Sequence, residues 1–85
     1  MAIVIIDVRE PIEYKMGHVK GAINLPPVAL MAGAEALAEL PKDTQIVVYC
    51  RTGTRSVASM HYLQQLGFTR VANGINQAHV EKNYL

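Results

Sequence analysis

The sequence predicts an α/β fold with a mostly parallel central sheet flanked by helices on both faces. Two continuous apolar, β-branched runs, residues 2–8 (AIVIIDV) and 45–49 (QIVVY), are typical of strands buried on both sides. Segments of helical composition separate the strands, as parallel pairing requires. Because 85 residues leave room for only one core, we expect a single domain over residues 1–85.

The first third of the chain is predicted to form a strand, a short helix and a second strand. We expect run 2–8 at the centre of the sheet. Segment 10–17 begins near a proline and ends on a glycine, which favours one or two helical turns. A short strand over 22–26 must stop at Pro26 and Pro27, because proline cannot continue a central ladder.

Residues 28–40 (VALMAGAEALAEL) are predicted to form one continuous helix. The segment is rich in Ala, Leu and Glu, which are strong helix formers. Its apolar residues recur at helical spacing despite Gly33. The side chains placed on the shared face are Leu30, Ala34, Leu37 and Leu40.

The second half of the chain continues the alternation. Residues 41–44 (PKDT) predict a turn, and run 45–49 delivers Cys50 at its carboxyl end. A helix is expected over 56–66, closed by Gly67. Residues 70–73 are expected to be the last short strand, followed by a turn and a short helix. In open sheets of this kind, ligands bind beyond the carboxyl ends of the strands, where Cys50 is placed.

The composition excludes several classes of protein. The chain is 51% hydrophobic and 18% charged, which suits a folded core and not a disordered segment. With a net charge of +1 and no basic run, nothing indicates nucleic-acid binding. No apolar stretch approaches a membrane span, and the amino terminus lacks the basic start of a signal peptide, so we expect a cytoplasmic protein without membrane contact. The single cysteine cannot form an internal disulfide.

The acidic residues are unevenly distributed. Between Thr44 and Val80 there is no Asp or Glu, whereas Arg51, Arg55 and Cys50 lie inside this stretch. Positive surroundings favour a thiolate and attract small anions. Chance clustering of charges in a short chain is the alternative interpretation.

The residues after Cys50 (RTGTR) predict a reactive cysteine. A short turn from strand to helix directs backbone N–H groups inward, and the start of a helix adds positive character. Gly53 permits the curvature. Such a cradle lowers the pKa of a thiol, so that no general base is needed. A buried cysteine that only packs is the alternative, but it would not require this polar turn.

Two ordered motifs resemble the rhodanese family in its small single-domain form. Residues 6–26 (IDVREPIEYKMGHVKGAINLP) are similar to the family's amino-terminal signature, and residues 46–74 are similar to its active-site strand, loop and helix. Together they cover most of the chain. The family often closes with Gly-Gly-x-x-x-Trp, whereas this chain has NGINQAH, with Asn73 at the first Gly and His79 at the Trp.

The resemblance implies that Cys50 is the catalytic nucleophile of a thiosulfate sulfurtransferase. Its thiolate would take the outer sulfur of thiosulfate or a similar small anionic donor, release sulfite and become a persulfide, which an external thiol or cyanide would then discharge. A thiol-bearing protein is a further candidate acceptor. No cofactor and no metal are implied. The residues expected to bind the substrate are Arg51, Thr52, Gly53, Thr54 and Arg55.

Other polar residues are predicted to have structural roles. Asp7, Arg9 and Glu13 are expected to form a polar scaffold near the strand ends. His18 is interpreted as a structural histidine with its hydrogen bonds satisfied, and His61 as a surface or packing residue.

Three alternatives remain at the level of sequence. A cysteine phosphatase or arsenate reductase of related fold resembles His-Cys-x-x-x-x-x-Arg, but here Tyr49 precedes the cysteine and the arginine is one position closer. A noncatalytic interaction module would not need Cys50 with both arginines. A sulfur relay to a protein acceptor is compatible with the chain, which has no second cysteine to resolve a persulfide.

Overall fold

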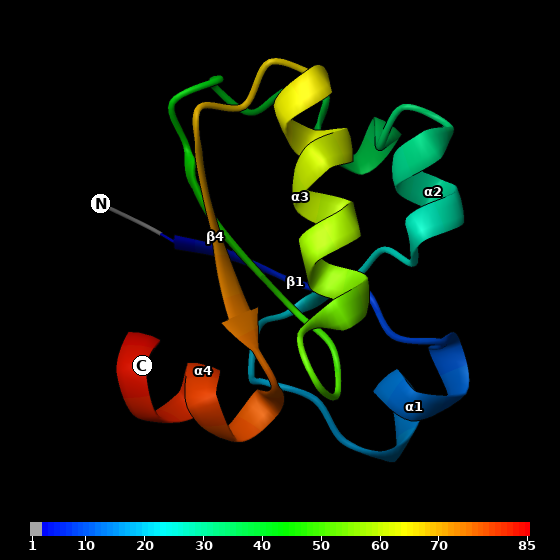
Figure 1. Cartoon of the computed structure of the whole chain (residues 1–85), viewed down its shortest axis with the longest axis vertical. Helices are drawn as coiled ribbons and strands as arrows, with labels where there is room; N and C mark the ends of the chain where they lie inside the picture. Colours follow the sequence, from blue (N-terminus) through cyan, green and yellow to red (C-terminus); the bar gives the residue numbers. More distant parts are fainter. Residues whose placement is uncertain (1–2) are drawn as a thin grey trace.

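Four parallel strands form one sheet in the order β2-β1-β3-β4 (Figure 1). The computed structural model describes residues 3–85, so Ala2, which we predicted in the first strand, lies outside the described residues. The strands are β1 (Ile3–Asp7), β2 (Ile23–Asn24), β3 (Gln45–Tyr49) and β4 (Arg70–Ile75). The central position predicted for β1 is confirmed, and its partner at the centre is β3.

The pairing of β1 with β3 brings together the two strand ends that bear polar side chains. β1 and β3 pair in register from Ile3 with Gln45 to Asp7 with Tyr49. Asp7 and Cys50 therefore emerge at the same edge of the sheet, the edge at which parallel α/β sheets bind ligands. The predicted bounds of β3 are confirmed, whereas β4 is two residues longer than the predicted strand over 70–73.

The helices follow the predicted order with one exception. They are α1 (Pro11–Met16), α2 (Pro27–Met31), the 3₁₀ helix η1 (Glu35–Leu37), α3 (Thr54–Gln65) and α4 (Gln77–Tyr84). Pro11 at the start of α1, Gly17 after its end and Gly67 after α3 are confirmed as helix boundaries. α3 begins two residues before the predicted Ser56, so the turn after Cys50 is shorter than expected. Within residues 3–85 no helix is long and apolar enough to cross a lipid bilayer.

The continuous helix predicted over 28–40 is wrong. α2 ends at Met31, and Gly33 and Ala34 adopt left-handed backbone angles (φ +110° and +50°) before η1 begins. Left-handed residues interrupt a right-handed helix, and glycine makes the break inexpensive. The same apolar residues still reach the core, because Leu30, Ala34 and Leu37 are buried.

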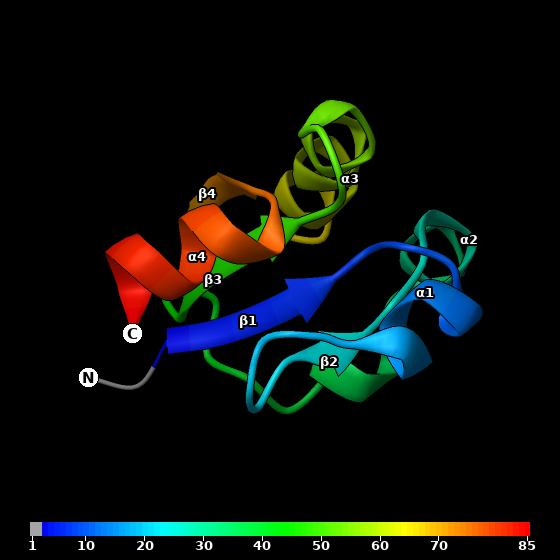
Figure 2. The same cartoon turned by 90° about the horizontal axis from the view of Figure 1, so that it is seen from below.

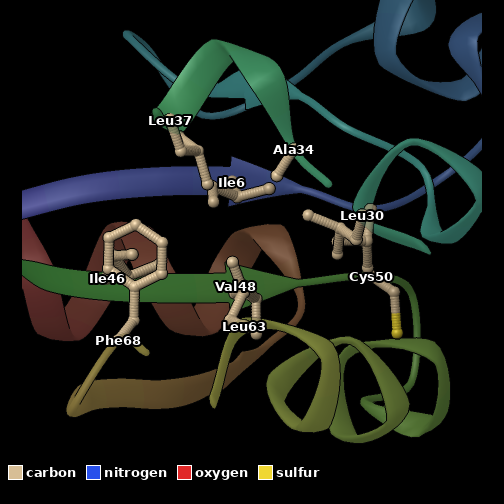
Figure 3. Close-up of a cluster of buried hydrophobic side chains, with 10 residues drawn as sticks. Ile6, Leu30, Ala34, Leu37, Ile46, Val48, Cys50, Leu63 and Phe68 are labelled. Carbon is tan, nitrogen blue, oxygen red and sulfur yellow. The ribbon is translucent and has the colours of Figure 1, made fainter. Parts of the chain in front are cut away.

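Two apolar clusters cover the two faces of the sheet, which confirms the predicted layering. α2, η1 and α3 lie over one face, where Ile6, Val48 and Leu63 share a cluster with the Cys50 side chain (Figure 3). α4 covers the other face through Val80, which packs with Val47 and Tyr49. Figure 2 shows the strands lying between α4 and α2.

The end of β4 departs from regular strand geometry. The register with β3 shifts between Val48 and Tyr49, so that Tyr49 pairs with Ile75. Ile75 has φ +72°, a conformation that a β-branched residue adopts only under strain. Gly74, one position earlier, has no room for a side chain, since an added Cβ would lie 2.5 Å from Val80 and 2.8 Å from Val47. β4 and α4 therefore pack closely where the chain passes from one to the other.

Candidate active site

Cys50 occupies the carboxyl end of β3, with only 2% of its surface exposed. Its backbone N–H donates to the carbonyl of Ile75 at 3.1 Å, which joins it to the irregular end of β4. In Figure 3 the sulfur points from the end of β3 toward the first turn of α3, and Leu30 covers the cysteine from the side of α2. The turn that follows the cysteine therefore determines the surroundings of the sulfur.

Hydrogen-bond donors of this turn face the sulfur. The Gly53 N–H donates to Sγ at 3.0 Å, and the Ser56 hydroxyl lies 3.7 Å from Sγ. Burial acts most strongly on the thiol and raises its pKa, but the backbone N–H groups of Ser56, Thr52 and Gly53 and the Ser56 hydroxyl together outweigh it. The pKa of Cys50 thus lies below its ordinary value, which favours the thiolate form.

Gly53 makes the tight turn possible. It has φ +94° and stands immediately before α3. A side chain there would also touch Asn73 and Ile75, both at 3.5 Å, so the turn lies directly against the end of β4. The sequence-based expectation that Gly53 permits the curvature is consistent with this geometry.

Arg55 forms an ion pair with a residue that the sequence analysis did not predict as its partner. Its guanidinium forms two hydrogen bonds with the Glu13 carboxylate, at 2.8 and 3.3 Å, and joins α3 to α1. The Arg55 hydrogen bonds, followed by the Glu10 N–H, lower the pKa of Glu13 to about 2. The stretch that is free of acids in the sequence therefore has a carboxylate beside it in space.

Arg51 has different surroundings. It is exposed, and within residues 3–85 it forms no ion pair. It lines a surface pocket of about 230 Å³ together with Arg9, Glu13 and Met16. The pocket therefore combines one unpaired cation with an ion-paired arginine and a half-buried carboxylate.

The remaining residues of the predicted binding turn are placed at its outer surface. The hydroxyls of Thr52 and Thr54 are exposed and lie 3.3 Å apart. Thr54 and Arg55 belong to the first turn of α3 and not to a loop. His, Cys, Asp and Glu side chains of residues 3–85 do not gather in groups of three that could hold a metal ion.

Ser56 and Asn73 are site residues that sequence reasoning missed. Ser56 is fully buried, and its hydroxyl donates to Asn73 Oδ1 at 2.6 Å or to the Gly53 carbonyl at 2.9 Å. Asn73 comes from β4, 17 positions later in the chain. Ser56 could have been recognised from the sequence, because it directly follows Arg55 in the motif. Asn73 could not, because its position depends on how β4 pairs with β3.

The polar scaffold expected from the amino-terminal signature is present in part. Asp7 is fully buried and forms a bidentate ion pair with Arg9 at 2.7–3.1 Å. The Tyr49 hydroxyl donates to Asp7 at 3.0 Å. Glu13 does not join this group, because it pairs with Arg55. The His18 ring stacks on Tyr14 and its Nδ1 lies 2.8 Å from the Tyr14 carbonyl, as expected for a structural histidine.

Comparison with known proteins gives a consistent result. The family model described as a rhodanese-like domain matches residues 1–76. The chain is 38% identical over 68 residues to the thiosulfate sulfurtransferase PspE of Escherichia coli, covering 80% of this chain and 64% of that protein. It is 42% identical over 65 residues to the probable adenylyltransferase/sulfurtransferase MoeZ of Mycobacterium tuberculosis, covering 76% of this chain and 16% of that protein. The chain thus spans less than two thirds of the length of either relative.

A solved structure shares most of its length with the chain. This structure, described as a rhodanese with anions from E. coli, superposes with a TM-score of 0.80 at 35% identity, over 92% of this chain and 91% of that one.

Proposed function

The chain belongs to the rhodanese-like domain family, and we propose that it is a sulfurtransferase in which Cys50 carries a sulfane sulfur as a persulfide. The observation that carries this proposal is the Cys50 sulfur itself. It is buried at a strand end, accepts a hydrogen bond from Gly53 N–H at 3.0 Å and has a lowered pKa. A thiolate held in this way is a nucleophile that needs no adjacent base.

The proposed reaction has two transfers. In the first, the Cys50 thiolate attacks the outer sulfur of thiosulfate, a new S–S bond forms, and sulfite leaves with the electron pair of the broken bond. In the second, cyanide or a thiolate attacks the outer sulfur of the persulfide, and the electron pair returns to the Cys50 sulfur. The protein begins and ends as a thiolate, so no external oxidant or reductant is needed.

The turn is proposed to stabilise the sulfur through its backbone. Donors at Thr52, Gly53 and Ser56 lower the thiol pKa and would also face the inner sulfur of a persulfide. We therefore propose that backbone N–H groups at the start of α3, and not arginine side chains, contribute most to stabilising the negative charge on the sulfur.

Arg51 is the arginine proposed to bind the donor anion. It is exposed and lines the pocket of about 230 Å³, whereas Arg55 is already paired with Glu13. The related E. coli structure is described as a rhodanese with anions, which supports the proposal that this chain also binds an anion. We assign Arg55 to holding α1 against the active-site turn.

The acceptor is proposed to be external. The chain contains only one cysteine, so a persulfide on Cys50 cannot be resolved by an internal disulfide. Cyanide, a small thiol and a thiol-bearing protein each satisfy this requirement.

Mass spectrometry of the intact protein tests the proposal. After incubation with thiosulfate and removal of excess donor, the parent should gain one sulfur atom, and dithiothreitol should remove it. Cys50→Ala, folded as judged by circular dichroism, should gain none. A parent that gains no sulfur at any donor concentration would refute the persulfide carrier.

A further inference from the structure

Asn73 bonds to three parts of the cradle around Cys50. Its Oδ1 accepts hydrogen bonds from the Ser56 hydroxyl at 2.6 Å and from Ile75 N–H at 2.8 Å. Its Nδ2 donates to the Gly53 carbonyl at 3.5 Å. Ser56 and Gly53 are also the residues whose side chain and N–H face the Cys50 sulfur. Among residues 3–85, the hydrogen bonds of the Asn73 side chain go to these neighbours and not to the sulfur, so its influence on the sulfur passes through them.

The Ser56 hydroxyl has one hydrogen and three neighbouring acceptors. These are Asn73 Oδ1 at 2.6 Å, the Gly53 carbonyl at 2.9 Å and Cys50 Sγ at 3.7 Å. When Cys50 is a thiol, its S–H can donate to Ser56 Oγ while Ser56 donates to Asn73, which satisfies the chain. When Cys50 is a thiolate, it can only accept, and it gains the Ser56 hydrogen only if Asn73 Oδ1 or the more distant Gly53 carbonyl gives it up.

The orientation of the Asn73 amide is fixed by the backbone. If the amide turned over, its NH₂ group would face Ile75 N–H, and two donors would meet. Oδ1 therefore remains an acceptor toward Ser56, held by Ile75 N–H from the strained end of β4.

We propose that Asn73 is a positioning residue that draws the Ser56 hydroxyl hydrogen away from the Cys50 sulfur until the thiol loses its proton. On ionisation the thiol proton leaves to solvent, and the Ser56 hydroxyl turns toward the sulfur without losing its own hydrogen. Asn73 thus stabilises the resting thiol and works against the N–H donors of the turn. This inference rests on the proposed function only in that Cys50 is taken as the reactive group.

The other groups around the sulfur are either charged or apolar, and among residues 3–85 none of the charged ones forms a hydrogen bond with the Asn73 side chain. Arg55 of α3 faces Cys50 and is paired with Glu13 of α1, and Arg51 follows the cysteine in the turn. Leu30 of α2 and Leu63 of α3 share the buried cluster of Cys50 and are apolar. Replacing the neutral Asn73 therefore leaves the net charge around the sulfur unchanged.

The test is the pH dependence of Cys50 alkylation by iodoacetamide, which needs no sulfur donor. Asn73→Ala should move the midpoint down by about half a pH unit, because the Ser56 hydroxyl then competes for the sulfur only with the Gly53 carbonyl at 2.9 Å and no longer with Asn73 Oδ1 at 2.6 Å. Ser56→Ala should move it up by about one unit, because the thiolate loses a donor. Adding Asn73→Ala to Ser56→Ala should not move the alkylation midpoint further, because the hydroxyl through which Asn73 acts is already absent.

Asn76→Ala is the matched control, because Asn76 lies three positions after Asn73 and just beyond the end of β4. Asn76 accepts from His79 N–H at 2.8 Å and caps α4, so its loss should lower the melting temperature without moving the alkylation midpoint. If Asn73→Ala does not fold, the Asn73 side-chain carbonyl can be followed by ¹³C NMR in the parent. Its shift should change at the Cys50 midpoint, and this change should disappear in Ser56→Ala.

Two results would overturn the inference. One is a folded Asn73→Ala protein whose midpoint is unchanged or higher. The other is a parent Asn73 carbonyl signal that does not respond to Cys50 ionisation. A third result would refute the proposed function and leave this inference intact. In that case the alkylation midpoints shift as expected, but the protein never accepts sulfur from thiosulfate.

Discussion

Arg51 and Arg55 have different surroundings although only three residues separate them. Arg55 forms a two-point contact with Glu13, and charge-assisted pairs of this geometry hold a guanidinium in a fixed position. Arg51 is exposed at the pocket and forms no ion pair within residues 3–85. A free guanidinium is the better ligand for a small oxyanion, because nothing must be displaced first.

Arg51→Ala is therefore expected to raise the KM for thiosulfate about tenfold, which corresponds to one charge-assisted hydrogen bond. The melting temperature should stay close to that of the parent, and the effect on KM should shrink as salt increases. Steady-state kinetics with cyanide as acceptor measure this. Arg70→Ala, which removes an exposed arginine at the start of β4, is the control. A KM change of the same size in Arg70→Ala would show that only overall charge matters.

At the scale of elements, the contact between Glu13 and Arg55 ties the short helix α1 to α3, the helix that follows the turn after Cys50. α1 has six residues, none of them buried, so packing alone holds it weakly. Its first turn is also stabilised by a capping box, in which Glu13 accepts from Glu10 N–H at 2.9 Å. One carboxylate thus serves both the start of α1 and the link to α3.

The pair predicts an acid-dependent loss of stability. The pKa of Glu13 is lowered to about 2, so its contribution is fully present above the ordinary pKa of 4.5 and is lost as the pH falls toward 2. Because both side chains are partly exposed, the contribution is at most about 1 kcal/mol. Urea denaturation at pH 6 and at pH 2.5 should show a larger drop for the parent than for Glu13→Gln. Equal drops in the two proteins would contradict the assigned part of this pair.

Local patterns predicted some elements better than others, for physical reasons. The run 45–49 is mostly apolar and β-branched and ends beside Cys50, so both the strand and the placement of the cysteine followed from composition. The break at Gly33 and Ala34 did not, because helix-forming composition outweighed one glycine. Arg55 with Glu13 and Ser56 with Asn73 join residues 42 and 17 positions apart, and no local pattern encodes such contacts.

At the scale of the whole molecule, a buried polar network joins neighbouring strands on one face of the sheet. The fully buried Tyr49 hydroxyl accepts from Val19 N–H at 3.0 Å and donates to Asp7, which in turn holds Arg9. The network connects β3, the end of β1 and the segment that leads into β2. Burial, followed by the effect of Asp7, raises the pKa of Tyr49 to about 12.

Alkaline unfolding tests this network. A phenol pKa raised from 10 to about 12 contributes stability that is present below pH 10 and is lost as the pH rises through 12, on the order of 2 kcal/mol. Tyr49→Phe should be less stable than the parent at pH 7, because Asp7 and Val19 N–H lose a partner. It should also lose less stability between pH 10 and 12, so the two curves converge. Parallel curves would contradict the network, and Tyr62→Phe is the control.

The central claim, that Cys50 carries the sulfur between donor and acceptor, is tested most directly by thiosulfate labelled only in its outer sulfur. After one half-reaction, the account predicts one labelled sulfur per chain on the peptide that contains Cys50, and unlabelled sulfite in solution. After donor removal, cyanide should release all of the label as thiocyanate and return the thiol. Labelled thiocyanate that forms while the isolated protein never carries label would contradict the account.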